Sequence, residues 1–298
     1  MRILVTGGTG QIGFELLRNL SPLGDIVAPN RQELDLTDSQ AVKRYLDDCQ
    51  PGCIVNAAAY TAVDRAESEP DLAHTLNASL PEILAQYAAV NDIWLVHYSS
   101  DYVYPGAGET ARSEDASTDP LSVYARSKLS GDQAVEASNV KHMIFRTSWV
   151  YSARGQNFMK TMLKLGAEKD ALSIVNDQYG SPTPARLIAQ VSTLALYRVL
   201  HSKVTELLQG IYHLAPRGTT NWHEFAVAIF EVAAEQGMPL KVNSGQVKGI
   251  PTQDYPTPAP RPLNSRLALD KIERTFGLQL PDWRQQLHQT ITEFVQYK

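Results

Sequence analysis

A glycine-rich turn between a β-branched segment and an amphipathic segment constrains the fold of this chain more than any other feature. Residues 2–6 read R-I-L-V-T, the turn 7–13 follows without a spacer, and a helical pattern covers 11–19. Glycine permits the tight turn and lets backbone N–H groups approach a pyrophosphate, whose charge is favoured at a helix N-terminus. The pattern predicts a dinucleotide site with contacts from Gly7, Gly10, Gln11, Ile12 and Gly13.

Short β-branched runs alternate with longer helical patterns over most of the chain, which is typical of a doubly wound parallel sheet. Strands are predicted at 2–6, 25–28, 53–56, 93–99, 141–146, 172–175 and 211–214. Helices are predicted at 11–19, 39–48, 81–90, 123–137, 157–168, 184–200, 221–235 and 282–297. The crossovers are long enough for helices, so the strands are expected to run parallel.

These patterns predict an α/β protein with a Rossmann-type core and a smaller, mainly C-terminal substrate-binding domain. Residues 1–147 are expected to form the core, and segments near 172–214 return to it. Residues 148–171 and 215–298 are expected to bind mainly substrate. The proline-rich stretch 249–265 excludes an α-helix and is either a linker or a loop that covers a ligand.

Composition excludes several classes of protein. The 298 residues carry 27 Lys and Arg against 32 Asp and Glu, so there is no basic excess for a nucleic-acid partner. Cys49 and Cys53 cannot build a disulfide framework or a four-cysteine zinc site. No run approaches the ~20 apolar residues of a membrane span. We therefore expect a cytoplasmic protein, acting as a monomer or homodimer.

The segment after the second predicted strand bears on the choice of cofactor. An acidic residue at its end would bind the ribose hydroxyls of NAD, but the chain reads Pro29-Asn30-Arg31. Arg31 offers a fixed positive charge suited to the 2′-phosphate of NADP. We predict NADPH with contacts from Asn30, Arg31 and Asp35; NADH remains the alternative because Glu33 and Asp35 lie close by.

A phenol and an ammonium group lie four residues apart, at Tyr124 and Lys128 of the predicted helix 123–137, and therefore on one face of it. The pKa of a phenol, about 10, must fall by roughly 3 units for proton transfer near neutral pH. Lys128 and an oxidised nicotinamide would lower it by stabilising phenolate. Lys128 can also hold the nicotinamide ribose.

Two other predicted strands end in residues that fit the same crevice. Ser99 and Ser100 each offer a hydroxyl to a substrate carbonyl at the carboxyl end of the strand 93–99. The strand 53–56 ends before Ala57, Ala58 and Ala59, whose small side chains let a cofactor approach the backbone.

In this order and spacing, the glycine turn, N-A-A-A, S-S-D-Y and Y-x-x-x-K resemble the extended short-chain dehydrogenase/reductase family. Within it, four further motifs resemble the reductases that act on dTDP-4-dehydrorhamnose. They are H-Y-S-S-D-Y-V-Y at 97–104, R-T-S-W-V-Y at 146–151, N-D-Q-Y-G-S-P-T at 176–183 and R-P-L-N-S-R-L at 261–267. The resemblance spans essentially the whole chain. Ser100 stands where threonine is frequent, so a hydroxyl donor is retained.

The resemblance implies NADPH-dependent reduction of the C4 ketone of a dTDP-sugar, with Ser100, Tyr124 and Lys128 as the catalytic residues. Substrate contacts are expected from Ser100, Asp101, Tyr102, Trp149, Asn157 and Arg261. Arg261 is the expected partner of the substrate pyrophosphate, since a guanidinium can clamp it bidentately. Some relatives require Mg²⁺, but the sequence shows no intact carboxylate site, and no metal ligand is predicted.

Two alternatives remain at this level. One is another extended-family enzyme, a nucleotide-sugar epimerase or dehydratase, although dehydratases commonly carry Asp-Glu after the serine or threonine and here Asp101-Tyr102 follows. The other is a non-catalytic regulatory subunit of methionine adenosyltransferase, which shares the fold and binds dinucleotide. The presence of Ser100, Tyr124 and Lys128 argues against the regulatory subunit, whereas product analysis with the ketosugar and NADPH would separate the reductase from the other enzymes.

Overall fold

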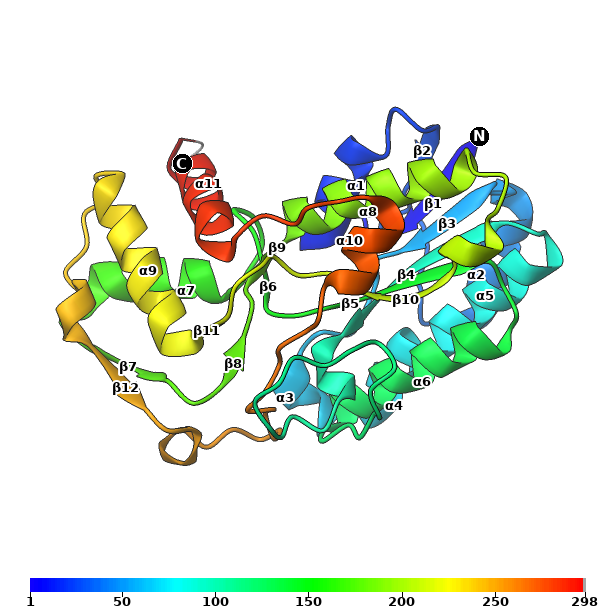
Figure 1. Ribbon diagram of the computed structural model, residues 1–298. Helices are drawn as coiled ribbons and strands as arrows, with labels where there is room; N and C mark the ends of the chain where they lie inside the picture. Colours follow the sequence, from blue (N-terminus) through cyan, green and yellow to red (C-terminus); the bar gives the residue numbers. More distant parts are fainter. Residues whose placement is uncertain (297–298) are drawn as a thin grey trace.

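A six-stranded parallel sheet in the order β10-β5-β4-β3-β1-β2 is the central element of the computed structural model, which describes residues 1–296 (Figure 1). Its strands are β1 (Arg2–Thr6), β2 (Asp25–Val27), β3 (Cys53–Asn56), β4 (Trp94–Ser100), β5 (His142–Thr147) and β10 (Gly210–His213). The predicted α/β class and parallel sheet are confirmed. The order places β1 beside β3, so the direction of winding reverses there.

Strict alternation along the strands explains why helices cover both faces of this sheet. Ile3 and Val5 contribute to one apolar cluster, and Leu4 between them contributes to the other. The first cluster includes side chains of α1 (Gln11–Asn19), α8 (Ala185–Leu200) and α10 (Asp270–Phe276). The second includes side chains of α2 (Ser39–Cys49), α5 (Leu80–Val90) and α6 (Val123–Ala137).

A second lobe lies beside the sheet, at the left of Figure 1, and has its own apolar cluster. Its helices are α7 (Phe158–Glu168), α9 (Trp222–Glu235) and α11 (Trp283–Gln296). Short strand pairs accompany them: β6 (Val150–Tyr151) with β9 (Thr183–Pro184), β8 (Tyr179–Gly180) with β11 (Thr220–Asn221), and β7 (Leu172–Val175) with β12 (Val247–Ile250).

Two segments lie elsewhere than the sequence predicted. The strand 172–175 pairs with β12 and not with the main sheet, so within 172–214 the segments that join the core are α8, Leu208, β10 and Leu214. The helix α10 packs on the core side through Ile272 and Phe276, although 215–298 was assigned mainly to substrate binding. Local pattern gives a segment's conformation, but its partner depends on which apolar face it meets.

Short helical segments fill the connections, and the sequence pattern predicted none of them. Between β3 and α5 lie α3 (Val63–Ala66), α4 (Pro70–His74) and the π-helical turn η1 (Thr75–Ser79). Single 3₁₀ turns occur at η2 (Asp101–Val103), η3 (Glu206–Leu208), η4 (Ser244–Gln246) and η5 (Thr252–Asp254). No helix within residues 1–296 is long and apolar enough to cross a lipid bilayer.

Candidate active site

The glycine turn between β1 and α1 is shaped by close backbone approach. Gly7 has a φ of +70°, and a Cβ there would lie 2.6 Å from the backbone nitrogen of Ala58. The Gly10 N–H donates to the Gly7 carbonyl at 2.9 Å, and α1 then starts without a side-chain cap. The amide groups of its first turn are therefore left for an anion, as a pyrophosphate requires.

The loop after β2 orders its acidic residues without using Arg31. The Asp35 carboxylate accepts from the Thr37 hydroxyl and amide at 2.7 and 2.9 Å, and Glu33 accepts from the Asn30 amide at 2.8 Å. Arg31 is exposed and forms no ion pair within residues 1–296. Its guanidinium is thus accessible to a phosphate, and the residues here fit a phosphorylated dinucleotide.

Helix α6 is held in place at its start and at its middle. The Ser122 hydroxyl accepts from the Ala125 amide at 3.2 Å, and the Glu67 carboxylate accepts from the Val123 amide at 2.9 Å. Further along, a Cβ on Gly131 would lie 2.0 Å from the carbonyl oxygen of Asn77. Glycine therefore lets α6 press against η1, and this contact sets the position of Tyr124 and Lys128 relative to the sheet.

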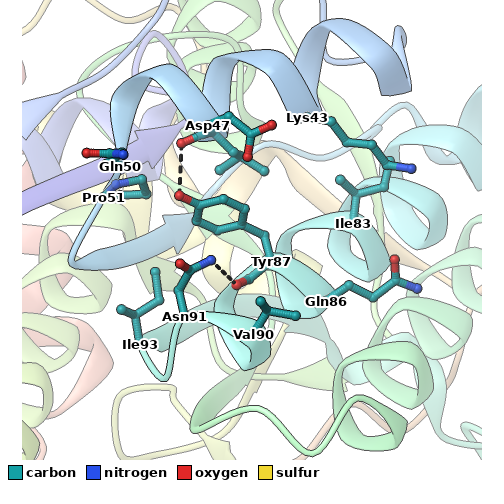
Figure 2. Close-up of a pocket in the computed structure, with 11 residues that line it drawn as sticks. Lys43, Asp47, Gln50, Pro51, Ile83, Gln86, Tyr87, Val90, Asn91 and Ile93 are labelled. Atoms are coloured by element: carbon teal, nitrogen blue, oxygen red, sulfur yellow. Dashed lines mark hydrogen bonds between the residues drawn. The ribbon is translucent and has the colours of Figure 1, made fainter.

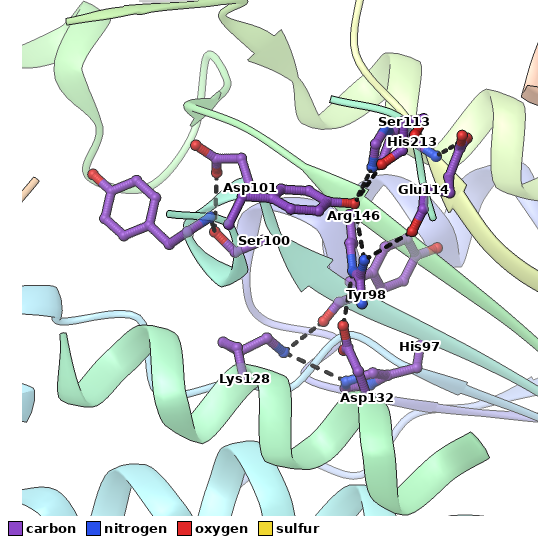
Figure 3. Close-up of polar contacts among 12 residues, drawn as sticks. His97, Tyr98, Ser100, Asp101, Ser113, Glu114, Lys128, Asp132, Arg146 and His213 are labelled. Carbon is purple, nitrogen blue, oxygen red and sulfur yellow. Dashed lines mark hydrogen bonds and ion pairs between the residues drawn. The ribbon is translucent and has the colours of Figure 1, made fainter. Parts of the chain in front are cut away.

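The structure brings Ser100, Tyr102 and Tyr124 together at the carboxyl end of β4. The rings of Tyr102 and Tyr124 meet edge to face, with centroids 5.9 Å apart. Burial raises the pKa of Tyr124 to about 12, and a hydrogen bond with the Ser100 side chain opposes the increase. Ser100 also donates to Asp101 Oδ1 at 3.0 Å (Figure 3).

Lys128 does not lower the pKa of Tyr124 in this structure, contrary to the expectation from spacing. Its Nζ donates to the carbonyl oxygen of Tyr98 at 2.5 Å and lies 3.5 Å from His97 Nε2. Burial lowers the pKa of Lys128 itself to about 8, while the Asp132 carboxylate raises it. The ammonium group is thus directed at the strand β4, and the phenol keeps its proton more firmly than predicted.

A buried ion pair between Asp132 and Arg146 lies next to Lys128 along α6. Asp132 lies one turn further along α6 and accepts from Arg146 Nε at 3.0 Å, with side chains 0% and 4% exposed respectively (Figure 3). Arg146 also donates to the Tyr104 hydroxyl at 2.9 Å. Tyr124, Lys128 and Asp132 therefore line one stripe of α6, in which phenol, ammonium and carboxylate follow at four-residue intervals.

Asp101 is buried beside the Ser100 hydroxyl. It is 2% exposed, and its Oδ2 has no hydrogen-bond partner among the described residues. Burial raises the pKa of this carboxyl group to about 7, and hydrogen bonds with Ser265 and Ser100 oppose the increase. A buried acceptor without a partner is suited to a hydrogen-bond donor such as a hydroxyl group.

Trp149 has an unusual backbone for a large residue, with a φ of +49°. Its ring stacks on Trp222 with centroids 3.8 Å apart, and Gly180 leaves room for it, since a Cβ there would lie 2.9 Å from the indole. The Trp222 Nε1 donates to Gln178 Oε1 at 3.1 Å. Stacking on Trp222 thus holds the strained backbone conformation of Trp149 in place. Strained backbone conformations of this kind are common at ligand-binding sites.

The side chain of Asn157 forms its hydrogen bonds with other residues of the protein. Its Oδ1 caps α7 by accepting from the Lys160 amide at 3.1 Å, and its Nδ2 donates to Gln11 Oε1 at 2.9 Å and to the Ser152 carbonyl at 2.8 Å. The predicted contact of Asn157 with the nucleotide has no support here. Instead, Asn157 and Gln11 join the second lobe to the glycine turn.

Arg261 lies on the proline-rich stretch that crosses from the second lobe to α3. Its Nη2 donates to Asp64 Oδ2 at 2.8 Å, and Asp64 Oδ1 accepts from the Ala259 amide at 3.2 Å. Its Nη1 is buried without a hydrogen-bond partner among the described residues. Of the two interpretations of this stretch, a loop over the crevice fits the contacts, and an unpaired guanidinium nitrogen is suited to an anion.

Sequence reasoning missed Asp64 and Trp222, which position Arg261 and Trp149. Nothing in the local pattern marks either residue, because each partner lies far away in the chain.

A cavity of about 730 Å³ between α2 and α5, lined by Lys43, Asp47 and Tyr87 among others, was also unpredicted (Figure 2). It lies where β3 and β4 begin, whereas α/β sheets bind ligands at their carboxyl ends.

Metal ligands do not converge in the part of the chain that the structure describes. Among residues 1–296, no group of three or more His, Cys, Asp or Glu side chains is placed to hold an ion. His213 lies with its Nε2 2.6 Å from the Tyr104 hydroxyl, and His223 faces the Val247 carbonyl oxygen. The described residues therefore do not fit a Mg²⁺ site.

Comparison with known proteins gives full-length matches. The family model described as "RmlD substrate binding domain" matches residues 1–296. The dTDP-4-dehydrorhamnose reductase of Salmonella typhimurium is 45% identical over 297 residues, which cover 98% of each chain. The crystal structure of the Clostridium acetobutylicum dTDP-4-dehydrorhamnose reductase superposes with a TM-score of 0.90 at 33% identity, covering 99% of this chain and 100% of that one.

A second solved structure bears on the cofactor. The Bacillus anthracis dTDP-4-dehydrorhamnose reductase, whose structure is in complex with NADP, has a TM-score of 0.86 and 34% identity, covering 98% of this chain and 99% of that chain. All these matches run through both lobes, so the similarity is not confined to the nucleotide-binding core.

Proposed function

The chain belongs to the dTDP-4-dehydrorhamnose reductase family, and from this premise we propose that it reduces the C4 ketone of dTDP-4-dehydro-β-L-rhamnose to give dTDP-β-L-rhamnose, with NADPH as the reductant. The observation that carries the proposal is the meeting of Ser100 and Tyr124 at the carboxyl end of β4, at the same edge of the parallel sheet as the glycine turn after β1. The full-length relatives are reductases, which favours this function over an epimerase, a dehydratase or a regulatory subunit.

In this proposal, Tyr124 gives its proton to the C4 oxygen as that oxygen gains charge, and Ser100 donates a hydrogen bond to the same atom. Asp101 accepts from a hydroxyl of the sugar. Tyr102 and Trp149 form walls of the sugar site, and Arg261 binds the diphosphate. The cofactor, when bound, supplies the hydride.

Residues of four segments would hold the cofactor. The backbone at Gly7, Gly10, Gln11, Ile12 and Gly13 receives the pyrophosphate. Asn30, Arg31 and Asp35 surround the adenosine ribose. Ala57, Ala58 and Ala59, together with Tyr124 and Lys128, lie against the nicotinamide half. The NADP complex of the Bacillus anthracis relative supports a nicotinamide cofactor.

The direct test is the loss of NADPH absorbance when the purified protein meets dTDP-4-dehydrorhamnose freshly generated from dTDP-glucose. We expect one NADPH oxidised per ketosugar, and a product that co-elutes with dTDP-rhamnose. A protein that binds NADPH but leaves the ketosugar unchanged, or that converts it without oxidising NADPH, would contradict the proposal.

Replacing Arg31 tests the choice of cofactor. In Arg31→Ser we expect KM for NADPH to rise by about 10–100-fold, the value of a charge-assisted hydrogen bond, because the 2′-phosphate loses its only fixed cation in this loop. KM for NADH should change little. Steady-state kinetics with both cofactors measure this, and equal effects on both would show that Arg31 does not distinguish them.

Replacing Arg261 tests the diphosphate site. In Arg261→Met, which keeps much of the side-chain volume, we expect KM for the dTDP-sugar to rise by about 10–100-fold with a smaller change in kcat. Inhibition by dTDP should weaken in parallel, whereas inhibition by thymidine, which lacks phosphate, should not. A loss confined to kcat would place Arg261 elsewhere in the reaction.

The proposal extends to the partners of the protein and its location in the cell. The net charge of −5 supports a small-molecule substrate over a nucleic acid. Both cysteines are free and buried, which fits a reducing compartment such as the cytoplasm. We extend the proposal to a monomer or homodimer.

A further inference from the structure

A row of buried polar side chains crosses the sheet from β1 to the catalytic lysine. Thr6 lies opposite Asn56 in the register of β1 with β3, and Asn56 lies opposite His97 in the register of β3 with β4. All three are at most 1% exposed, and Lys128 beyond them is 2% exposed. Each member must therefore find its hydrogen-bond partner within the row or in the backbone beside it.

The direction of the hydrogen bonds is set at the β1 end. The Thr6 hydroxyl oxygen accepts from the Ala58 amide at 3.4 Å, and its proton is donated to Asn56 Oδ1 at 2.6 Å. The amide oxygen of Asn56 thus faces Thr6, so its NH₂ group faces His97. Reversing the Asn56 amide would leave the Thr6 hydroxyl with two donors and no acceptor.

This orientation determines which ring nitrogen of His97 carries hydrogen. Asn56 Nδ2 lies 3.1 Å from His97 Nδ1, so Nδ1 is the acceptor. Burial and the Lys128 charge hold the pKa of His97 well below its usual range, so the ring is neutral and carries a single proton. That proton must be on Nε2, which lies 3.5 Å from Lys128 Nζ (Figure 3).

An N–H directed at an ammonium group is a contact between two donors, which disfavours the charged lysine. A neutral amine, in contrast, can accept from Nε2–H while it donates to the Tyr98 carbonyl oxygen. From this geometry we infer that His97 is a positioning residue that lowers the proton affinity of Lys128, through a tautomer fixed by Asn56 and Thr6. The inference rests on the proposed function for its catalytic consequence.

Other groups around Lys128 act on the same equilibrium. Asp132 on α6 favours the ammonium form, but its carboxylate is shared with Arg146 from β5. Tyr124 lies one turn before Lys128 on α6, and His142 of β5 acts on His97. With Asp132 drawn to Arg146, the His97 Nε2–H is the neighbour that specifically favours a neutral amine. The burial that lowers the pKa of Lys128 to about 8 acts in the same direction.

The expected consequence is that activity falls at alkaline pH. In the proposed reaction the charged form of Lys128 would hold the nicotinamide ribose, and that form is lost as pH rises through the pKa of Lys128. Removing the Nε2–H donor should raise that pKa and extend activity to higher pH. A residue that only filled space beside Lys128 would not shift a titration in this way.

The test uses nuclear magnetic resonance on the full-length protein, so it does not depend on activity. Ring nitrogen shifts should show His97 protonated at Nε2 and unprotonated at Nδ1. In ¹³C-lysine-labelled protein, with the resonance assigned through Lys128→Met, the Lys128 titration should move up by about one pH unit in His97→Leu. Thr6→Val, which frees the Asn56 amide to turn, should move it in the same direction by less.

His213→Leu is the matched control, since His213 is also 0% exposed on a strand of the same sheet but contacts Tyr104 and not Lys128. It should lower stability and leave the Lys128 titration in place. A His97 proton on Nδ1, or an unchanged titration in His97→Leu, would overturn the inference whether or not the ketosugar is reduced. If NADPH oxidation fails while the titration shifts as expected, the proposed function is wrong and the tautomer assignment stands.

Discussion

Tyr124→Phe is expected to lower kcat by about 10²–10⁴-fold, because it removes the proton donor to the C4 oxygen. The ring of phenylalanine can keep the edge-to-face contact with Tyr102, so the fold should be retained. Single-turnover oxidation of NADPH at saturating ketosugar measures the chemical step. The dissociation constant for NADPH, from fluorescence titration, should be nearly unchanged.

Tyr212→Phe is the control for this change. Its hydroxyl donates to the Leu208 carbonyl oxygen at 3.0 Å in the core, away from the crevice, and its loss should leave kcat unaltered. If Tyr124→Phe turned over at the rate of the parent protein, the assignment of Tyr124 as the acid would be wrong. A loss of NADPH binding as large as the loss of kcat would instead show a damaged site.

Asp132→Ala is expected to lower the free energy of unfolding by about 3–5 kcal/mol, because it leaves the Arg146 guanidinium buried without its carboxylate. Both side chains are almost fully buried, so water cannot replace the missing partner. Urea denaturation followed by circular dichroism measures the change. Lys128 also loses the carboxylate that favours its charged form, so the alkaline limb of activity should move to lower pH.

Two further variants separate the buried charge from simple loss of volume. Asp132→Leu combined with Arg146→Met removes both charges and should recover much of the stability. Lys141→Ala breaks the surface pair with Asp92, whose carboxylate is 80% exposed, and should cost less than about 1 kcal/mol. If Asp132→Ala were as mild as Lys141→Ala, the buried pair would have no special role in stability.

The fold could be predicted because its pattern is local. The run at 2–6, the glycine turn and the helix at 11–19 are contiguous, and each strand of the main sheet carries an apolar residue on both faces. The strand 172–175 was correctly predicted as a strand and wrongly associated with the main sheet. The residue pattern of 172–175 does not indicate which strand it will pair with, and its partner β12 lies more than 70 residues later in the chain.

The residues of the candidate site likewise fall into those that local pattern predicts and those that depend on distant partners. Tyr124 and Lys128 could be found because helical periodicity places them on one face, and Ser100 because it ends a strand. The partner of Arg261 could not, since Asp64 is separated from it by 197 positions. Asn157 was assigned to the nucleotide, but its amide caps α7 and holds Gln11, which no local pattern indicates.

By itself, the sequence determined the order along the chain of the six main-sheet strands and the long helices, the turn suited to a dinucleotide, and the residues able to donate a proton, because each depends on neighbours a few positions away. Only the tertiary structure decided the protonation of those residues. Burial raises the pKa of Tyr124 and lowers that of Lys128, and the register of three strands aligns Thr6, Asn56 and His97. Desolvation and hydrogen-bond direction arise from contacts between distant segments, which exist only once the chain has folded.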